Sequence, residues 1–305
     1  MRPAIRRARA LVAALGLCLA ASAQAQEAVE SSPRRILGAA EQMAFRGVGR
    51  LDFGAGYCTA TLFDERHALT AAHCLYDETG RLRPAADLWF RAGLRGDGQQ
   101  AVRQVRRAVP HPAYRWNGPE ATLEDISADL AMVELDQPLL TTEFPNYLPG
   151  DLPPPGGAVA LLSYGQGRDR ALSLQAPCRV LQRRGAVAQL DCEADPGSSG
   201  SPVLVRDAGG ALRLVGVISA KGRRLSYAAA VSDALPGLRW AMERAGPRRS
   251  PAPGFGAGAI TTNSTGGAPV AGAGAGTGAT GGGGHGAGLS PGRSGGWKSV
   301  RPPTD

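Results

Sequence analysis

The sequence predicts an all-β fold made of two units, and three features of the chain indicate it. Short runs rich in β-branched and aromatic residues occur in both halves, and Gly, Pro and Asp turn signals bound them. Residues 137–157, between the two groups of runs, contain six prolines, which oppose regular structure and indicate a connector. A stretch with several large apolar residues follows the last run and could form a C-terminal helix.

The expected strands fall into two groups along the chain. The first group covers residues 47–53, 57–63, 87–92, 101–109 and 130–135, with no long amphipathic helix between them. The second group covers residues 158–164, 178–182, 187–192, 203–205, 212–219 and 226–231. The expected helix contains Leu235, Leu238, Trp240 and Met242, with Pro236 in its first turn.

Residues 1–25 are expected to form a signal peptide. They open with four arginines, continue through an apolar run at residues 10–21 and end in Ala23-Gln24-Ala25, a small-residue cleavage pattern. The run is shorter than the ~20 residues that a membrane-spanning helix needs, and no later segment approaches that length. We therefore expect a secreted or periplasmic protein without a membrane span.

The last part of the sequence, residues 246–305, consists mainly of Gly, Ala, Ser, Thr and Pro. Because it contains almost no large apolar residues, it cannot offset the entropy of ordering, and we expect a disordered tail. The formal net charge is +8, and the arginines of the leader supply half of it. The other basic residues are scattered and form no stripe, which argues against nucleic-acid binding.

Four cysteines remain once the leader is removed, namely Cys58, Cys74, Cys178 and Cys192. An even number of cysteines in an exported chain predicts disulfides, here two of them. Cysteine count alone leaves three pairings open.

Three short motifs carry candidate catalytic residues. Ser199 lies in Pro196-Gly197-Ser198-Ser199-Gly200-Ser201-Pro202, His73 follows Thr70-Ala71-Ala72, and Asp129 precedes Leu130-Ala131. A serine hydroxyl is a weak nucleophile, so it needs an imidazole to take its proton and a carboxylate to orient that imidazole. The chain order His, Asp, Ser differs from the orders found in subtilisins and α/β-hydrolases.

These peptides resemble the chymotrypsin/trypsin-like serine peptidase family over residues 36–245, with the nearest likeness to secreted bacterial, glutamyl-endopeptidase-like members. The resemblance implies two six-stranded β-barrels, at about residues 36–136 and 158–245, joined by the connector at 137–157. It also implies a C-terminal helix that docks on the second barrel. It favours the disulfides Cys58–Cys74 and Cys178–Cys192, each of which closes a short loop.

The same resemblance assigns roles to the three residues. His73 is the expected general base on a tight turn, and Asp129 is its buried partner. Asp125, which precedes Ile126, competes for the role of the carboxylate but is not followed by a strand-like run. The backbone N–H groups of Gly197 and Ser199 are the expected oxyanion donors.

Residues for substrate binding are expected near the end of the strand at 212–219. Ser219 resembles the family serine that contacts the buried carboxylate, and its strand would pair with the substrate backbone, with Ala220 and Lys221 following. Glu193 lies six residues before Ser199, where trypsin-like enzymes carry their pocket aspartate. Lys221 would instead favour an acidic side chain, so the preferred residue stays open.

Arg35-Ile36-Leu37-Gly38 resembles the site at which zymogens of this family are cut, which makes residues 26–35 a possible propeptide. In trypsin-like relatives the new amine pairs with an aspartate just before the catalytic serine. That position is Ser198 here. The alternative is that Ile36 simply begins the first strand region.

The sequence therefore predicts a secreted serine endopeptidase that acts as a monomer on protein or peptide substrates through an acyl-enzyme. No metal or cofactor is expected, because no cluster of His, Cys and Asp outside the cysteine set has ligand spacing. Two alternatives remain, a non-catalytic binding module and an esterase of the same fold.

Overall fold

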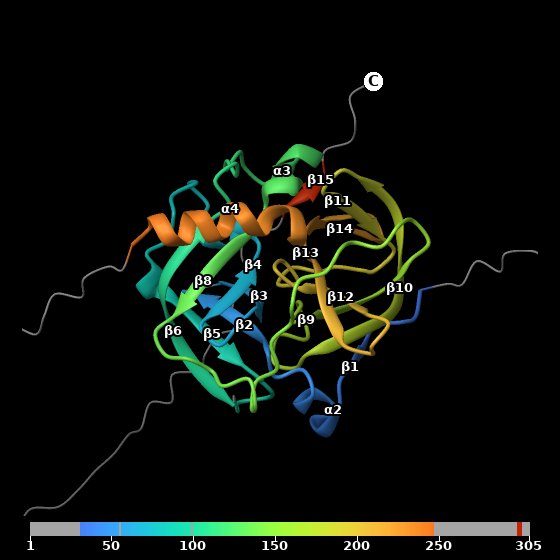
Figure 1. Ribbon diagram of the computed structural model, residues 1–305, viewed down its shortest axis with the longest axis horizontal. Helices are drawn as coiled ribbons and strands as arrows, with labels where there is room; N and C mark the ends of the chain where they lie inside the picture. The colour runs from blue at the N-terminus through green and yellow to red at the C-terminus, as the bar shows by residue number, and fades with distance from the viewer. Residues whose placement is uncertain (1–30, 55, 99, 247–297, 301–305) are drawn as a thin grey trace, which may run out of the picture.

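The computed structural model describes residues 31–54, 56–98, 100–246 and 298–300. The leader expected at residues 1–25 and the first residues of the possible propeptide lie outside these ranges. Two β-barrels lie side by side, and α4 crosses the upper part of the view, below α3 (Figure 1).

Six antiparallel strands close the first barrel in the order β2-β3-β4-β8-β6-β5. They are β2 (Val48–Phe53), β3 (Gly56–Leu62), β4 (His67–Thr70), β5 (Leu88–Ala92), β6 (Ala101–Pro110) and β8 (Ala131–Leu135). Inward-facing side chains such as Leu51, Phe90 and Val133 are fully buried in one apolar cluster. Five of these strands lie in the runs that the sequence predicts, and β4 was missed.

The second barrel uses β9 (Ala158–Ser163), β10 (Ser173–Arg184), β11 (Val187–Leu190), β12 (Pro202–Arg206), β13 (Leu212–Gly222) and β14 (Leu225–Ala230). Their order is β12-β9-β10-β11-β14-β13, and a further pairing between β12 and β13 closes the ring. The expected all-β fold with two six-stranded barrels is confirmed. No helix or strand occurs in residues 137–157 between β8 and β9.

The C-terminal helix is present but sits differently from the expectation. α4 (Val231–Arg244) begins early enough that Pro236 lies inside the helix and not in its first turn. It packs on β6 and β8 of the first barrel as well as on β13, so its docking is not confined to the second barrel. The Arg107 guanidinium of β6 donates to the carbonyls of Met242 (3.1 Å) and Gly246 (2.8 Å), which holds the end of the helix.

The other helices are short: α2 (Ala39–Met43), the 3-10 helices η1 (Ala72–Leu75) and η2 (Ala85–Asp87), and α3 (Leu123–Ala128). Three two-residue strands complete the structure, namely β1 (Arg35–Ile36), β7 (Glu120–Ala121) and β15 (Ser299–Val300). β1 pairs with β10, and β15 lies between β13 and β7.

β15 corrects the expectation of a tail without regular structure, at least for residues 298–300. Lys298 is fully buried, and Ser299 and Val300 pair with two other segments. The composition argument failed here because it counted only large apolar side chains. Backbone groups at a sheet edge and a long lysine side chain also provide partners for a short segment. Residues 247–297 and 301–305 lie outside the described ranges.

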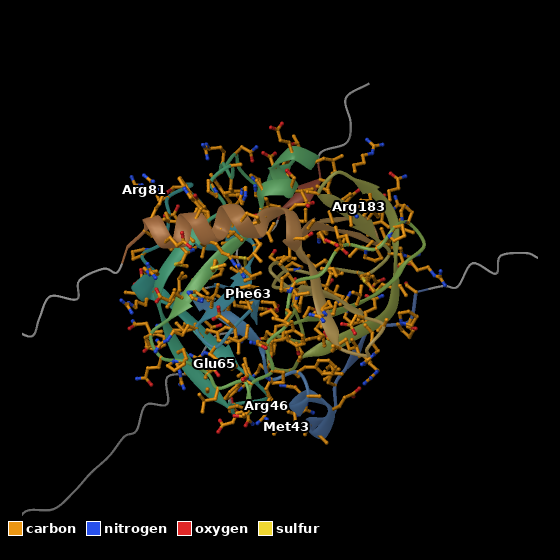
Figure 2. All side chains as sticks on the ribbon, in the orientation of Figure 1. Met43, Arg46, Phe63, Glu65, Arg81 and Arg183 are labelled. Atoms are coloured by element: carbon orange, nitrogen blue, oxygen red, sulfur yellow. A yellow bond between two sulfur atoms is a disulfide. The ribbon has the colours of Figure 1, made fainter. Side chains whose placement is uncertain are left out.

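The four mature cysteines form the expected disulfides, Cys58–Cys74 and Cys178–Cys192. The labelled arginines Arg46, Arg81 and Arg183 lie far apart around the molecule (Figure 2), which fits the scattered basic residues of the sequence. Within the described residues, no helix is long and apolar enough to cross a membrane.

Candidate active site

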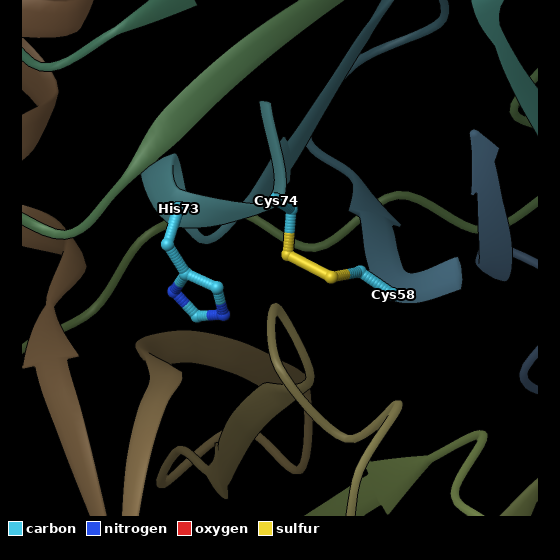
Figure 3. A group of neighbouring side chains, drawn as sticks. All are labelled: Cys58, His73 and Cys74. Carbon is cyan, nitrogen blue, oxygen red and sulfur yellow. A yellow bond between two sulfur atoms is a disulfide. The ribbon is translucent and has the colours of Figure 1, made fainter. Parts of the chain in front are cut away.

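His73 lies in η1, directly after β4 of the first barrel. Its neighbour Cys74 is bonded to Cys58 of β3, with the two Cα atoms 6.3 Å apart, so the turn is covalently attached to an adjacent strand. The imidazole lies beside the disulfide and extends from the turn toward the ribbon of the second barrel (Figure 3). The disulfide therefore fixes the backbone from which the ring projects.

Asp129 is the C-cap residue of α3 and comes two residues before β8. Its fully buried carboxylate accepts three hydrogen bonds: from the His73 backbone N–H at 2.8 Å, from His73 Nδ1 at 2.7 Å and from Ser219 Oγ at 2.5 Å. A carboxylate with this set of donors holds the proton of His73 on Nδ1, which leaves Nε2 as an acceptor.

The pKa of the Asp129 carboxyl is set by opposing effects. Burial favours the neutral form, but the charge and hydrogen bond of His73, the charge of Lys298 and the Ser219 hydroxyl hold the pKa below its ordinary value. The carboxylate therefore stays ionised at neutral pH and can stabilise an imidazolium.

Ser199 lies on a sharp turn between two glycines with left-handed backbone, Gly197 at φ +90° and Gly200 at φ +82°. A Cβ on Gly200 would lie 2.0 Å from the Thr59 carbonyl oxygen and 2.2 Å from Thr70 Oγ1. The Ser199 carbonyl accepts a 2.8 Å hydrogen bond from the Thr59 N–H. These contacts hold the turn of Ser199 against β3 and β4 of the first barrel, and Thr70 precedes His73 by three residues.

Ser199 Oγ and His73 Nε2 are both buried, and neither hydrogen-bonds to any described residue, including the other. Buried polar groups are normally paired, and a role in a reaction is one reason for an exception. Both atoms therefore keep their hydrogen-bonding capacity for a further group such as a substrate.

The geometry of the 196–199 turn suits an oxyanion site. The Pro196 carbonyl accepts a 2.7 Å hydrogen bond from the Gln166 N–H. In a trans peptide the C=O and the following N–H point in opposite directions, so the Gly197 N–H points away from Gln166. Among the described hydrogen bonds, neither the Gly197 N–H nor the Ser199 N–H donates to a protein acceptor, so both are free to bind an oxygen.

Asp125, the competing carboxylate, has a different task in the structure. It forms a capping box at the start of α3, where Oδ2 accepts from the Thr122 N–H and hydroxyl, each at 2.8 Å. The sequence signal was present, since Thr122 and Asp125 have the three-residue spacing of a capping box. α3 was missed, and it is the helix that delivers Asp129 to His73.

The expected substrate-binding residues are only partly brought together. Ser219 contacts Asp129, and Ala220 after it is fully buried in a small cluster with Ile126 of α3. The Lys221 N–H donates to the Lys298 carbonyl. Glu193, however, is half-exposed and pairs with Arg34 at 3.2 Å, so its charge already has a partner outside this strand.

The segment around Ile36 forms a continuous strand. Ile36 is exposed and pairs with Ser173 of β10, and the Leu37 N–H donates to Leu172. Asp195 binds two arginine side chains, Arg34 through a short contact and Arg168 at 2.8 Å. This three-residue ion cluster, Arg34, Arg168 and Asp195, lies beside Ser198 at the turn that carries Ser199.

The structure contains two groupings of potential metal ligands within the described residues, Cys58 with His73 and Cys74, and Cys178 with Asp191 and Cys192. Each contains a disulfide, and disulfide sulfurs have no thiolate to offer a metal. Neither grouping therefore indicates a metal centre.

Sequence reasoning missed Arg34, Arg168, Tyr114 and Lys298. Arg34 and Arg168 bind Asp195, and the Lys298 ammonium lies over the Tyr114 ring. No local signal identifies these residues, because each acts on a segment far away in the sequence. Tyr114 follows the exposed residues Pro112 and Ala113, but its own side chain is buried.

Comparison with known proteins shows the family of the chain. The model of the Trypsin family matches residues 39–234. The chain is 30% identical to Serine protease 23 of Mus musculus over 175 residues and to that of Homo sapiens over 172 residues. Each match covers 49% of this chain and 43% of the relative, so the chain spans less than half of these proteins. These relatives are mammalian, whereas the expected likeness was to secreted bacterial members. The chain belongs to the trypsin family of serine proteases.

Proposed function

We propose that this protein is a secreted serine endopeptidase in which Ser199, His73 and Asp129 form the catalytic triad. The observation that carries the proposal is the fully buried Asp129 carboxylate, which binds both His73 Nδ1 and Ser219 Oγ. Family membership alone implies a protease-like protein. The hydrogen bonds of this chain support the specific residues.

The mechanism follows from the geometry. His73 Nε2 takes the proton of Ser199 as Oγ attacks the carbonyl carbon of a peptide bond, and Asp129 stabilises the resulting imidazolium. The N–H groups of Gly197 and Ser199 bind the oxyanion, a contribution of about 2.7–4 kcal/mol per donor. His73 then protonates the leaving amine, and water hydrolyses the acyl-enzyme by the same steps in reverse.

Export is supported by the leader-like sequence and by two disulfides, which persist in oxidising compartments. The protein would then act in the periplasm or outside the cell on protein or peptide substrates, as a monomer. Similarity to the bacterial glutamyl-endopeptidase-like branch stays a prediction, because the relatives described above are mammalian.

We also propose that activity does not require cleavage after Arg35. The turn that carries Ser199 is held by the ion cluster of Arg34, Arg168 and Asp195, all within one uncut chain. Burial opposes ionisation of Asp195, but the Arg168 hydrogen bond and the charge of Arg34 hold the pKa of its carboxyl below the ordinary value. Cleavage after Arg35 would cut the strand that links Arg34 to the rest of the barrel.

A fluorophosphonate probe tests the proposed function without knowledge of the substrate. It should label the signal-free protein, and Ser199→Ala should abolish labelling, because only an activated serine reacts. Ser201→Ala is the matched control, a buried serine in the same motif, and it should still be labelled. Absence of labelling in folded, disulfide-bonded protein would instead favour a binding module. Labelling with ester but no peptide hydrolysis would favour an esterase.

A further inference from the structure

The strand β15 extends the sheet of the second barrel, where it lies between β13 and the two-residue strand β7. Ser299 of β15 pairs with Lys221 at the end of β13 and, on its other side, with Glu120 of β7. The Lys221 N–H donates to the Lys298 carbonyl at 3.2 Å, and the Ser299 N–H donates to the Pro119 carbonyl at 3.0 Å. β15 lies beside α3 and β13 (Figure 1).

Both segments that hold β15 lead directly to the buried carboxylate. On one side, Ser219 precedes Lys221 by two residues in β13 and donates to Asp129. On the other side, Ala121 of β7 is followed by α3, whose C-cap is Asp129. An extended peptide that adds to the end of β13 therefore lies beside the proposed triad, and residues 298–300 already do so.

The Lys298 side chain occupies a pocket suited to a cation. It is fully buried, and Nζ hydrogen-bonds to no described residue. Nζ lies 5.1 Å from the ring centroid of Tyr114 and 5.2 Å from that of Trp116. Aromatic faces attract an ammonium at this range.

Two carboxylates add to this attraction. Burial lowers the pKa of the Lys298 ammonium, and the charges of Asp129 and Asp125 oppose that shift. A neutral side chain of equal length would gain nothing from these charges. The pocket, defined here as the lysine subsite, therefore selects a basic side chain by its rings and its nearby carboxylates.

We propose that residues 298–300 are an internal ligand of β13, with Lys298 in a subsite for basic side chains formed by Tyr114 and Trp116. This segment competes with lysine-containing peptides for the end of β13 and for the lysine subsite. Competition with substrates rests on the proposed function, whereas docking and peptide binding do not. The segment is held by few backbone hydrogen bonds, and Val300 is only partly buried against Ala121, Ile126 and Ala220. It can therefore be displaced by a peptide that offers more contacts.

The test uses the full signal-free chain with Lys298→Met, which keeps the length of the side chain and removes its charge. Arg244→Met is the matched control, because Arg244 lies over the Trp240 ring on α4, away from β15. Hydrogen exchange of the Lys221 and Ser299 amides reports docking without reference to activity. Two cation–π contacts predict that exchange at these amides accelerates about tenfold in Lys298→Met and not in Arg244→Met.

A blocked peptide with the sequence of residues 296–301 then tests competition. It should slow exchange of the Lys221 amide in Lys298→Met at lower concentration than in the unchanged chain, and its Lys→Met counterpart should not. KM for a lysine-containing peptide substrate should fall about tenfold in Lys298→Met and stay constant in Arg244→Met. Unaltered exchange in Lys298→Met, or equal binding of both peptides, would overturn the proposal.

The fluorophosphonate label separates the two proposals. If the probe fails to label but the exchange results hold, the internal ligand stands and the proposed function fails. If the probe labels and exchange accelerates while KM stays constant, the segment docks without competing, and the proposal is overturned.

Discussion

Replacing Asp129 by Asn changes one oxygen to an NH2 group and should remove general-base catalysis. The carboxylate oxygen Oδ1 faces the His73 backbone N–H at 2.8 Å, and that donor cannot change its role. The amide oxygen must therefore occupy this position, which turns the NH2 toward His73 Nδ1 and Ser219 Oγ. Nδ1 then has to accept a hydrogen bond, and the ring proton moves to Nε2.

A ring with its proton on Nε2 cannot take the proton of Ser199. The expected loss of turnover is about 10⁴-fold, or about 5.4 kcal/mol of transition-state stabilisation. The assay is kcat for a peptide or ester substrate, together with the rate of fluorophosphonate labelling. The matched control is Asp125→Asn, which alters a carboxylate of the capping box on the same helix and should leave kcat within about twofold.

Two results would refute this reasoning. Turnover of Asp129→Asn within tenfold of the unchanged enzyme would show that the carboxylate does not select the tautomer. A large loss in Asp125→Asn with retained folding would transfer the role to that residue. Circular dichroism of both variants checks that the fold is intact.

The other predictions concern stability and activation. Gly200→Ala should lower the free energy of unfolding by more than about 3 kcal/mol, because the new Cβ would lie 2.0 Å from the Thr59 carbonyl oxygen. Gly210→Ala is the control, since Gly210 also has a positive φ but no neighbour near its Cβ position. In thermal unfolding this control should lower the free energy of unfolding by about 1 kcal/mol. The pKa of the Asp129 carboxyl is lower in the folded state than the unfolded value of about 3.9. The stability that this carboxylate contributes is therefore present above the unfolded pKa and is lost as the pH falls through the folded pKa. In urea unfolding between pH 5 and 2, the free energy of unfolding of Asp129→Asn should depend less on pH than that of the unchanged chain. An equal acid slope in both proteins would contradict this. Replacing Cys58 and Cys74 together by Ala should lower the free energy of unfolding by about 3 kcal/mol, and an unchanged denaturation midpoint would disprove a stabilising role. Arg35→Gln should keep the fluorophosphonate labelling rate of the unchanged chain, whereas loss of labelling would show that cleavage is needed.

Much of the fold and of the candidate site could be predicted from local sequence. Runs rich in β-branched and aromatic residues, bounded by turn signals, predicted eleven of the twelve barrel strands. His73, Asp129 and Ser199 could be proposed as the reacting residues because each such residue needs a particular sequence beside it. Ser199 needs glycines, His73 lies beside a cysteine, and Asp129 comes just before an apolar strand.

Only the tertiary structure decided how distant segments meet. The docking of α4 on the first barrel, the binding of Asp195 by Arg34 and Arg168, and the burial of Lys298 against Tyr114 all join residues far apart in the sequence. The sequence around a charged side chain does not reveal its partner, because ion pairs and cation–π contacts depend on distance in space. The sequence by itself determined most of the strands and the candidate reacting groups, because both depend on neighbouring residues. The packing of the two barrels determined what surrounds them.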